Sequence, residues 1–325
     1  MKTRQSIIIL LTAAATFAGC AKTSAPQTPL DNVVRVTADV KTATKGYCTT
    51  GKIESFDLFI KSESAKYSYT GTKFTKNSSI GEWEPERQLL WEGGSTPFTF
   101  LAVSPILTQR DCSIPDDLNN PVFNFSVEAN QTLESTASDL LLCSKGNVTR
   151  GGNTLDFDDA GRLKVAFTHS MSLLKIQLTF GTEFNHNGVP ATNPASDLIA
   201  NGFNGDAAVK MTDSGDWSIS AIDDTRKAIQ AYESVWAPAN DKEGNCKATF
   251  ECIVVPQSMT SFTLSFLASE NPYTYTANLG PGFSFQSGKE YVLSLVVGKD
   301  EAHLAEDISA KAWIGAGDSK DLETD

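Results

Sequence analysis

The sequence predicts an all-β protein, built as sandwiches or barrels of short strands, from three observations. Apolar and polar residues alternate with a period of two along most of the chain, and helical periodicity is nearly absent. The apolar runs are short and are separated by turns rich in Gly, Asn, Asp and Pro. The chain has 325 residues, of which 40% are hydrophobic, so we expect two domains, each with its own core.

The first twenty residues are organised like a secretory signal. Two basic residues precede the apolar run 7–17, which is too short to cross a bilayer. Residues 17–20, Phe-Ala-Gly-Cys, resemble the lipobox of bacterial lipoproteins. This resemblance implies cleavage between Gly19 and Cys20, with diacylglycerol and palmitate-type acyl chains on Cys20 as a membrane anchor. The alternative is an ordinary signal peptide with an incidental cysteine.

Residues 20–32 are small, polar and proline-containing, a composition typical of a flexible tether. Removal of residues 1–19 takes away Lys2 and Arg4 and changes the formal charge from −12 to −14. Such an acidic chain lacks the basic stripe that binding to nucleic acid requires. We therefore expect no nucleic-acid partner.

Alternating positions predict the strands in order. In the first half the inward positions are Val34, Val36, Ala38 and Val40, then Phe56, Leu58 and Ile60, then Phe98, Phe100 and Ala102. In the second half they are Leu174, Ile176, Leu178 and Phe180, then Ala248, Phe250, Cys252 and Val254, then Phe262, Leu264 and Phe266, then Tyr273, Tyr275 and Ala277, then Tyr291, Leu293, Leu295 and Val297. Turn formers cluster between residues 144 and 163, so we expect domains at 33–155 and 156–325.

Five cysteines follow Cys20, namely Cys48, Cys112, Cys143, Cys246 and Cys252. An odd number cannot pair completely within one chain. The last two lie on one predicted strand about 20 Å apart, so they cannot bond to each other. Most of the five are interpreted as small buried hydrophobes, and a single disulfide stays open.

No arrangement of residues indicates catalysis, a metal or a cofactor. The three histidines, His169, His186 and His303, have no metal-ligand spacing and are interpreted as surface or turn residues. Asp156, Asp158 and Asp159 lack the glycine and the glutamate of a calcium loop, which favours a solvated turn over a weak calcium site. Nucleophile-elbow and phosphate-loop motifs are absent. The sequence therefore predicts a protein that is not an enzyme.

Five tryptophans allow two interpretations. They are Trp83, Trp91, Trp217, Trp236 and Trp313. Such residues more often fill a sandwich core with the indole N–H bonded to backbone, but they could also form a platform that stacks on sugar rings.

Several stretches, in order, resemble the fimbrillin-like family, the lipoprotein-precursor pilins and accessory subunits of Bacteroidia-type (type V) pili. In the first half they are Trp83-Glu84-Pro85, Leu89-Leu90-Trp91, the run 98–105 and Ser138-Asp139-Leu140-Leu141. In the second half they are the run 167–176, Val254-Val255-Pro256-Gln257, the run 288–293 and Trp313. The resemblance extends from about residue 33 to the C-terminus.

The resemblance implies two tandem transthyretin-like β-sandwiches, with a first strand, residues 33–40, that proteolysis removes. The loop 41–46 follows, and Lys45 with Gly46 is the candidate processing site, where the family is commonly cut after arginine. A strand from another subunit would then refill the groove. The polar segment 318–325 alternates poorly as a donor strand, which favours a tip, anchor or accessory subunit over a shaft pilin.

The leading hypothesis is thus a structural or adhesive subunit of a cell-surface pilus, held in the outer membrane through Cys20. Its expected partners are other pilus subunits, the outer membrane and a host or bacterial surface ligand. The alternative is a lipid-anchored lipoprotein that binds glycans or proteins through its tryptophans.

Overall fold

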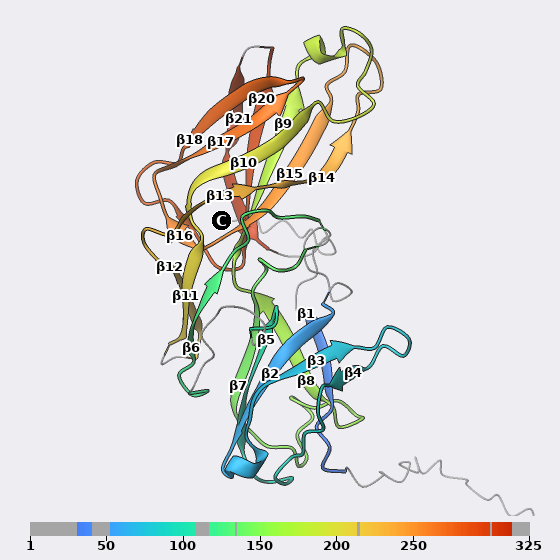
Figure 1. Ribbon diagram of the computed structural model, residues 1–325, viewed down its shortest axis with the longest axis vertical. Coiled ribbons are helices and arrows are strands. Elements are labelled where there is room, and N and C mark those ends of the chain that lie inside the picture. Colours follow the sequence, from blue (N-terminus) through green and yellow to red (C-terminus); the bar gives the residue numbers. More distant parts are fainter. Residues whose placement is uncertain are drawn as a thin grey trace, which may run out of the picture. The chain divides into compact units, whose positions relative to one another are not determined.

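The computed structural model describes residues 31–40, 53–107, 117–133, 135–212, 215–299 and 301–313 (Figure 1). Every described strand lies within residues 32–325. The described residues form twenty-one strands and two 3-10 turns, η1 (Ala65–Tyr67) and η2 (Thr182–Asn185), with no α-helix. The all-β prediction is confirmed. None of the helical segments in this part of the chain has the length and apolar character of a membrane span.

A seven-stranded sheet contains most strands of the first half, in the order β1-β8-β7-β5-β2-β3-β4. Its strands are β1 (Val36–Val40), β2 (Ser55–Ser62), β3 (Tyr69–Lys76), β4 (Trp83–Pro85), β5 (Phe98–Ser104), β7 (Leu141–Val148) and β8 (Leu163–His169). Only the β1–β8 pair is parallel. Since β8 follows the turns at 149–162, this sheet includes residues on both sides of position 155.

The side-chain alternation explains why these strands close on a core. Phe56 of β2 stacks on Phe74 of β3 with ring centroids 5.4 Å apart, and it meets Trp83 and Phe167 edge-on at 4.9 and 5.4 Å. All four side chains are buried. Aromatic pairs at these distances add favourable quadrupole contacts to the burial of apolar area, so they stabilise the centre of this smaller core cluster.

Two further sheets form the larger part of the second half (Figure 1). One has the order β13-β10-β17-β18 and contains β10 (Ala195–Asn204), β13 (Arg226–Gln230), β17 (Ser261–Ala268) and β18 (Asn271–Asn278). The other has the order β14-β15-β9-β20-β21 and contains β9 (Ser172–Phe180), β14 (Tyr232–Ala237), β15 (Lys247–Val254), β20 (Lys289–Val297) and β21 (Ala302–Ala312). Their inward positions, including Ile176, Phe250, Leu264 and Leu293, share the larger core cluster.

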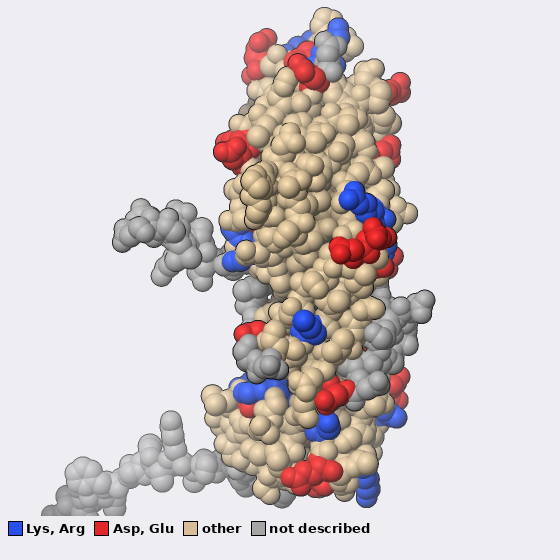
Figure 2. Space-filling model, turned by 90° about the vertical axis from the view of Figure 1, so that its left-hand side faces the viewer, with Lys and Arg blue, Asp and Glu red and all other residues tan. Residues whose placement is uncertain are grey.

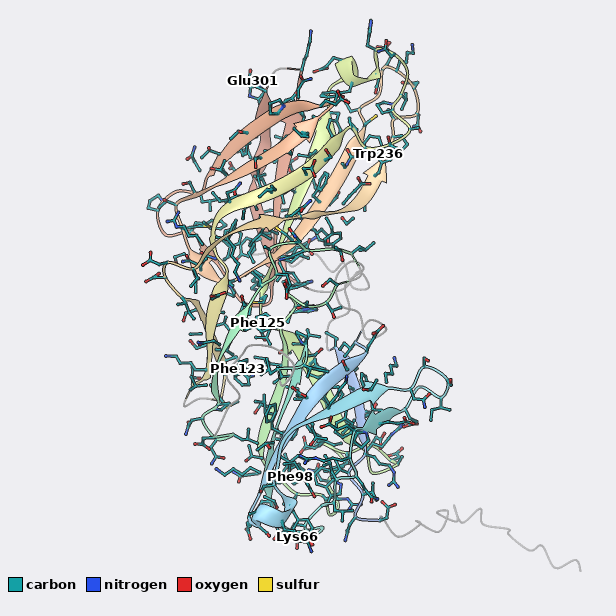
Figure 3. The ribbon with its side chains drawn as sticks, in the orientation of Figure 1. Lys66, Phe98, Phe123, Phe125, Trp236 and Glu301 are labelled. Carbon is teal, nitrogen blue, oxygen red and sulfur yellow. The ribbon has the colours of Figure 1, made fainter. Side chains whose placement is uncertain are left out.

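Two small sheets complete the topology. The first, β12-β11-β6, pairs β6 (Val122–Ser126) with β11 (Asp206–Met211), which in turn pairs with β12 (Trp217–Ala221). The second pairs β16 (Gln257–Ser258) with β19 (Ser284–Phe285). Phe123 and Phe125 of β6 (Figure 3) are buried in the larger core cluster. Strand β6 therefore joins the core of the second half although it precedes β7 in sequence.

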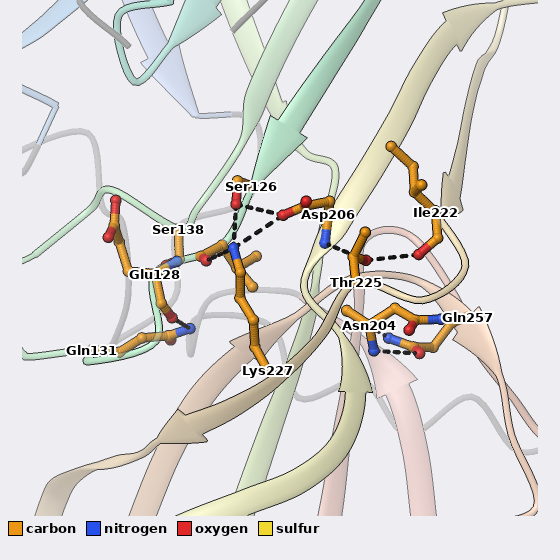
Figure 4. Close-up of polar contacts among 11 residues, drawn as sticks. Ser126, Glu128, Gln131, Ser138, Asn204, Asp206, Ile222, Thr225, Lys227 and Gln257 are labelled. Carbon is orange, nitrogen blue, oxygen red and sulfur yellow. Dashed lines mark hydrogen bonds and ion pairs between the residues drawn. The ribbon is translucent and has the colours of Figure 1, made fainter. Parts of the chain in front are cut away.

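Polar contacts fix β6 in this position (Figure 4). The Lys227 ammonium donates to the Ser126 hydroxyl, to the Val127 carbonyl at 3.2 Å and to Asp206 Oδ1 at 3.0 Å. The Ser126 hydroxyl donates to the same Asp206 oxygen at 2.6 Å. Partial burial raises the pKa of Asp206, but the hydrogen bonds from Ser126 and Lys227 outweigh it and lower the pKa overall. The cluster thus holds an ionised carboxylate between β6, β11 and β13.

Two glutamine side chains act as short pieces of β-ladder. Gln131 donates to the Ile253 carbonyl at 2.8 Å and accepts from the Ile253 N–H at 2.7 Å. Gln257 accepts from the Asn204 N–H at 3.0 Å and donates to the Asn204 carbonyl at 3.1 Å. Each amide bonds both the N–H and the carbonyl of one strand residue, so the segments that carry Gln131 and Gln257 are tied to the sheets.

Candidate functional site

The candidate site is β1 together with the part of the smaller core that it covers. Val34, Val36, Ala38 and Val40 are 1%, 2%, 8% and 6% exposed, while Asp39 between them faces solvent. The predicted alternation of this segment is confirmed. The four apolar side chains form one row, because alternate residues of a strand point to the same face.

The backbone of β1 is paired along one edge only. Val36 to Val40 lie opposite Leu163 to Phe167 in parallel register, and no other strand pairs with this segment among the described residues. The Leu163 N–H donates to the Arg35 carbonyl at 2.8 Å. Strand β1 is therefore an edge strand, held to its sheet by one ladder and by the burial of its apolar row.

The residues before β1 close the sheet on its other side. Val33 forms an isolated antiparallel bridge with Leu90. The Val34 N–H donates to the Leu89 carbonyl at 2.9 Å, and the Trp91 N–H donates to the Asn32 carbonyl at 2.7 Å. The residues before β1, at one end of the seven-stranded sheet, thus contact the residues that follow β4 at the other end. Removal of residues 32–40 would break both this closure and the ladder of β1 with β8.

The chain on either side of this strand lies outside the described residues. This includes the predicted processing site, Lys45 and Gly46, in the segment 41–52. It also includes Gly19 and Cys20, where signal cleavage and lipid attachment are predicted. These assignments stay predictions.

His169 corrects the interpretation of the histidines as surface or turn residues. Its side chain is 1% exposed, and Nδ1 lies 2.9 Å from Oδ1 of Asp139, which is fully buried. The ring stacks on Trp313 with centroids 3.9 Å apart. His303 is exposed and pairs with Glu301 at 3.0 Å. Sequence reasoning missed the His169 contacts because residues 139, 169 and 313 meet only through the fold.

The acidic turn is neutralised by basic side chains. Asp158 accepts from Arg162 Nε at 2.7 Å and from two backbone N–H groups, and Arg162 also reaches Glu82 at 2.9 Å. Asp156 pairs with Lys145. The part of the chain that the structure describes contains no group of three or more His, Cys, Asp or Glu residues placed to hold a metal. Ion pairs thus engage both Asp156 and Asp158, whose side chains are partly covered.

The tryptophans do not converge on one surface. Trp83, Trp91 and Trp313 are buried, and Trp217 and Trp236 are half-buried. Each packs against a different aromatic partner, for example Trp236 on β14 (Figure 3) against Phe180 at 6.1 Å. The Trp236 indole donates to the Ala191 carbonyl, as core tryptophans were expected to do. The Trp91 indole differs, since its buried N–H has no hydrogen-bond partner among the described residues.

Three cysteines are described, Cys143, Cys246 and Cys252, and the last two are free thiols. Cys246 and Cys252 are fully buried, while Cys143 is half-buried. Burial, together with the neighbouring Glu251 carboxylate, raises the pKa of the Cys252 thiol to about 12. These two buried cysteines behave as the small hydrophobes that the sequence predicted. Cys48 and Cys112 lie outside the described residues.

A buried ionic ladder crosses the five-stranded sheet and has no counterpart in the sequence analysis. It runs through Tyr232, Glu251, Lys175, Glu290 and Lys311, one from each strand in sheet order. Glu251 and Glu290 are only 4% and 3% exposed. In an alternating sequence, charged residues at outward positions are expected to be exposed to solvent. The pattern alone therefore gave no signal that Glu251 and Glu290 are buried.

The described residues define an all-β protein whose first strand lies at a sheet edge with its apolar row buried. The chain belongs to the fimbrillin-like family, whose sequence model matches residues 34–313. The predicted resemblance is thereby confirmed. This family consists of structural and adhesin proteins and not of enzymes, which confirms the prediction that the chain is not an enzyme.

Comparison with solved structures shows a similar fold in one case with a TM-score above 0.5, at low sequence identity. A candidate cell adhesion protein from Bacteroides uniformis is 15% identical, with a TM-score of 0.55 over 88% of this chain and 100% of that one. A fimbrial protein from Bacteroides vulgatus is 14% identical, with a TM-score of 0.49 over 86% and 99%. The fimbrial anchor protein Mfa2 from Porphyromonas gingivalis is 12% identical, with a TM-score of 0.43 over 88% and 99%. No curated protein matches the sequence.

Proposed function

We propose that this protein is a structural or adhesive subunit of a cell-surface pilus, assembled when β1 is removed by proteolysis and replaced by a strand from another subunit. The observation that carries the proposal is the position of β1. It is an edge strand with one ladder, yet its apolar row fills the smaller core. Family membership supports the same function.

Once β1 is removed, binding of a replacement strand is energetically favoured over leaving the groove that β1 occupied empty. Burial of a valine side chain is worth about 1.5 kcal/mol or more, so Val34, Val36 and Val40 together contribute on the order of 5 kcal/mol. Loss of β1 would expose this apolar surface and would also leave unpaired backbone groups along β8. An exposed edge of this kind binds an extended segment from another chain through main-chain hydrogen bonds and alternate side chains.

We further propose a terminal or accessory place in the pilus, with lipid on Cys20 holding the protein at the outer membrane. Residues 314–325 contain two large apolar side chains, Ile314 and Leu322. A donor for the β1 groove needs about four apolar residues at alternate positions, as β1 itself has. The groove left by β1 can therefore accept a strand from another subunit, while residues 314–325 would be a poor donor strand. Two tandem transthyretin-like domains are part of the same proposal.

Limited trypsin digestion tests the first step. The protein lacking residues 1–20 is digested and analysed by intact mass, and we expect a cut after Lys45. A Lys45→Gln variant serves as the control, because it should resist cleavage at this position.

Strand uptake tests the second step. A fluorescent peptide with the sequence of residues 33–40 is added to cut and to uncut protein, followed by size-exclusion chromatography. Uptake by the cut protein alone is expected, and a peptide with Val36→Asp and Val40→Asp should not be taken up. Cut protein that keeps its own β1 in the presence of excess peptide, and takes up none, would refute the proposal.

A further inference from the structure

Strand β18 is an unprotected edge strand in the second half of the chain. It pairs with β17 over eight residues without a bulge, from Ala268↔Asn271 to Ser261↔Asn278. No second strand pairs with it among the described residues. Neither β17 nor β18 contains a charged residue. Edge strands in soluble proteins usually carry charges or bulges that prevent pairing with other chains, and β18 has neither.

The neighbouring edge strand, β21, shows those protective features. Its pairing with β20 is interrupted twice, on either side of Ser294. It also carries Glu306, Asp307 and Lys311, and eight of its eleven residues are exposed. The contrast between the two edges points to β18 as the one that accepts a partner. Pro272 lies near the start of β18, where proline is tolerated on an edge, and the residues after it are free of proline.

An apolar pocket of about 280 Å³ opens beside the inner face of β18. Its lining includes Tyr275 and Leu279 from the β18 side, Leu293 of β20, and Leu304 and Ile308 of β21. Leu304 is 45% exposed although it faces this pocket. Tyr273, nearer the start of β18, does not line the pocket, and its hydroxyl lies 2.6 Å from the Lys299 carbonyl and 2.9 Å from the Gly298 carbonyl. The open space therefore lies next to the later residues of β18.

The charged residues around the pocket indicate which kind of peptide segment would bind there. The lining contains one ionisable carboxylate, Asp307, next to Glu306 in sequence, and no lysine or arginine. In Figure 2, which views the side on which β18 lies in Figure 1, the upper half is largely without charged side chains. A second copy of this chain would bring another Asp307 and a formal charge of −12, and like charges across paired strands are destabilising.

We propose that β18 and this pocket form a docking site for an extended segment of a different protein, which pairs with β18, inserts a large apolar side chain into the pocket and places a basic residue near Asp307. The segment becomes a fifth strand of the four-stranded sheet. This site goes beyond the strand exchange at β1, because it uses other strands and needs no proteolysis.

Fluorescence anisotropy with a labelled seven-residue peptide tests the site on uncut protein. The peptide alternates lysine with valine and has leucine at its centre. Controls carry glutamate in place of lysine, or proline in place of both valines, which removes backbone donors. We expect saturable binding of the lysine peptide alone. Equal binding of the proline or glutamate peptide, or no binding of any peptide, would overturn the proposal.

Matched variants locate the binding. Leu304→Lys should weaken binding at least about tenfold, because the apolar contact is lost and a cation is added. Val296→Lys is the control, since Val296 is 39% exposed on the adjacent strand and does not line the pocket. Asp307→Asn should weaken binding about threefold, the size expected for an exposed ion pair. Equal affinity of Leu304→Lys and Val296→Lys, at equal thermal stability, would rule the pocket out. If the wild-type protein forms a dimer and Leu304→Lys abolishes it, the partner at this site is a second copy of the chain. That result would also overturn the proposal.

Discussion

Replacement of Lys175 by methionine should destabilise the protein strongly, because Lys175 is the centre of the buried ionic ladder. Its ammonium lies 3.5 Å from Glu251 Oε1 and 3.2 Å from Glu290 Oε2. Each carboxylate also has an outer partner. The Tyr232 hydroxyl donates to Glu251 at 2.7 Å, and the Lys311 ammonium lies 3.1 Å from Glu290. Lys175→Met would leave two buried carboxylates with one partner each.

The expected loss in the free energy of unfolding is about 3 kcal/mol. Removal of one member of a buried ion pair typically costs about 3 to 5 kcal/mol, since the remaining charge is desolvated without compensation. The lower end applies here because the Lys175 side chain is 17% exposed and both carboxylates keep a partner. Lys61→Met is the matched control. Lys61 and Asp117 are both 49% exposed, so loss of this ion pair should change the free energy of unfolding little.

Urea denaturation followed by tryptophan fluorescence measures both variants, with the m-value as a check that the unfolding transition is unchanged. A triple variant, Lys175→Met with Glu251→Gln and Glu290→Gln, should recover stability relative to Lys175→Met, because the unpaired charges are removed. A difference of less than about 1 kcal/mol between Lys175→Met and Lys61→Met would show that water compensates the carboxylates and that the ladder is not effectively buried.

Three further predictions follow from single sites. Partial burial raises the pKa of Asp158, but hydrogen bonds from the backbone and side chain of Arg162 outweigh it and lower the pKa below 3.8. Asp158 therefore stabilises the fold above this pH and loses its effect as the pH falls through the folded-state pKa. The Asp158→Asn variant should be less stable than wild type at pH 7, and this difference in stability should disappear below pH 3.8. A stability difference in urea titrations that does not depend on pH would contradict this prediction. Cys252, with its raised pKa and full burial, should react with iodoacetamide at pH 8 only in urea, and native labelling detected by peptide mass would count against the buried assignment. Gly288→Ala should lower the melting temperature and reduce the free energy of unfolding by about 1 to 2 kcal/mol. The reason is that Gly288 has φ +67° and an added Cβ would lie 3.2 Å from the His169 carbonyl oxygen. An unchanged melting temperature would show that this turn relaxes freely.

The alternation of side chains determined much of the candidate site in advance. Val34, Val36, Ala38 and Val40 were predicted to face one way, and all four are buried. This inference succeeds because successive side chains of a strand point to opposite faces whatever the strand pairs with. The proposed role of this strand depends on the family as well, since alternation alone does not distinguish a removable strand from a permanent one.

The strand partners could not be predicted from the same pattern. Strand β6 pairs with β11 about eighty residues later, and β8 pairs with both β1 and β7. Backbone hydrogen bonds are made by nearly every residue type, so the sequence of one strand carries little information about which distant strand lies beside it. The buried ladder centred on Lys175 was missed for the same reason, because each member looks like an outward-facing charge when its own strand is considered alone.

The sequence by itself determined that the chain is all-β, which residues of each strand face inward, and to which family the chain belongs. The tertiary structure decided which edges are closed and which are open. Val33 meets Leu90 and closes one sheet, whereas β18 has one partner and an apolar pocket beside it. The physical reason is that side-chain alternation is a local property of a strand, while the exposure of an edge depends on where segments far apart in the chain come to lie.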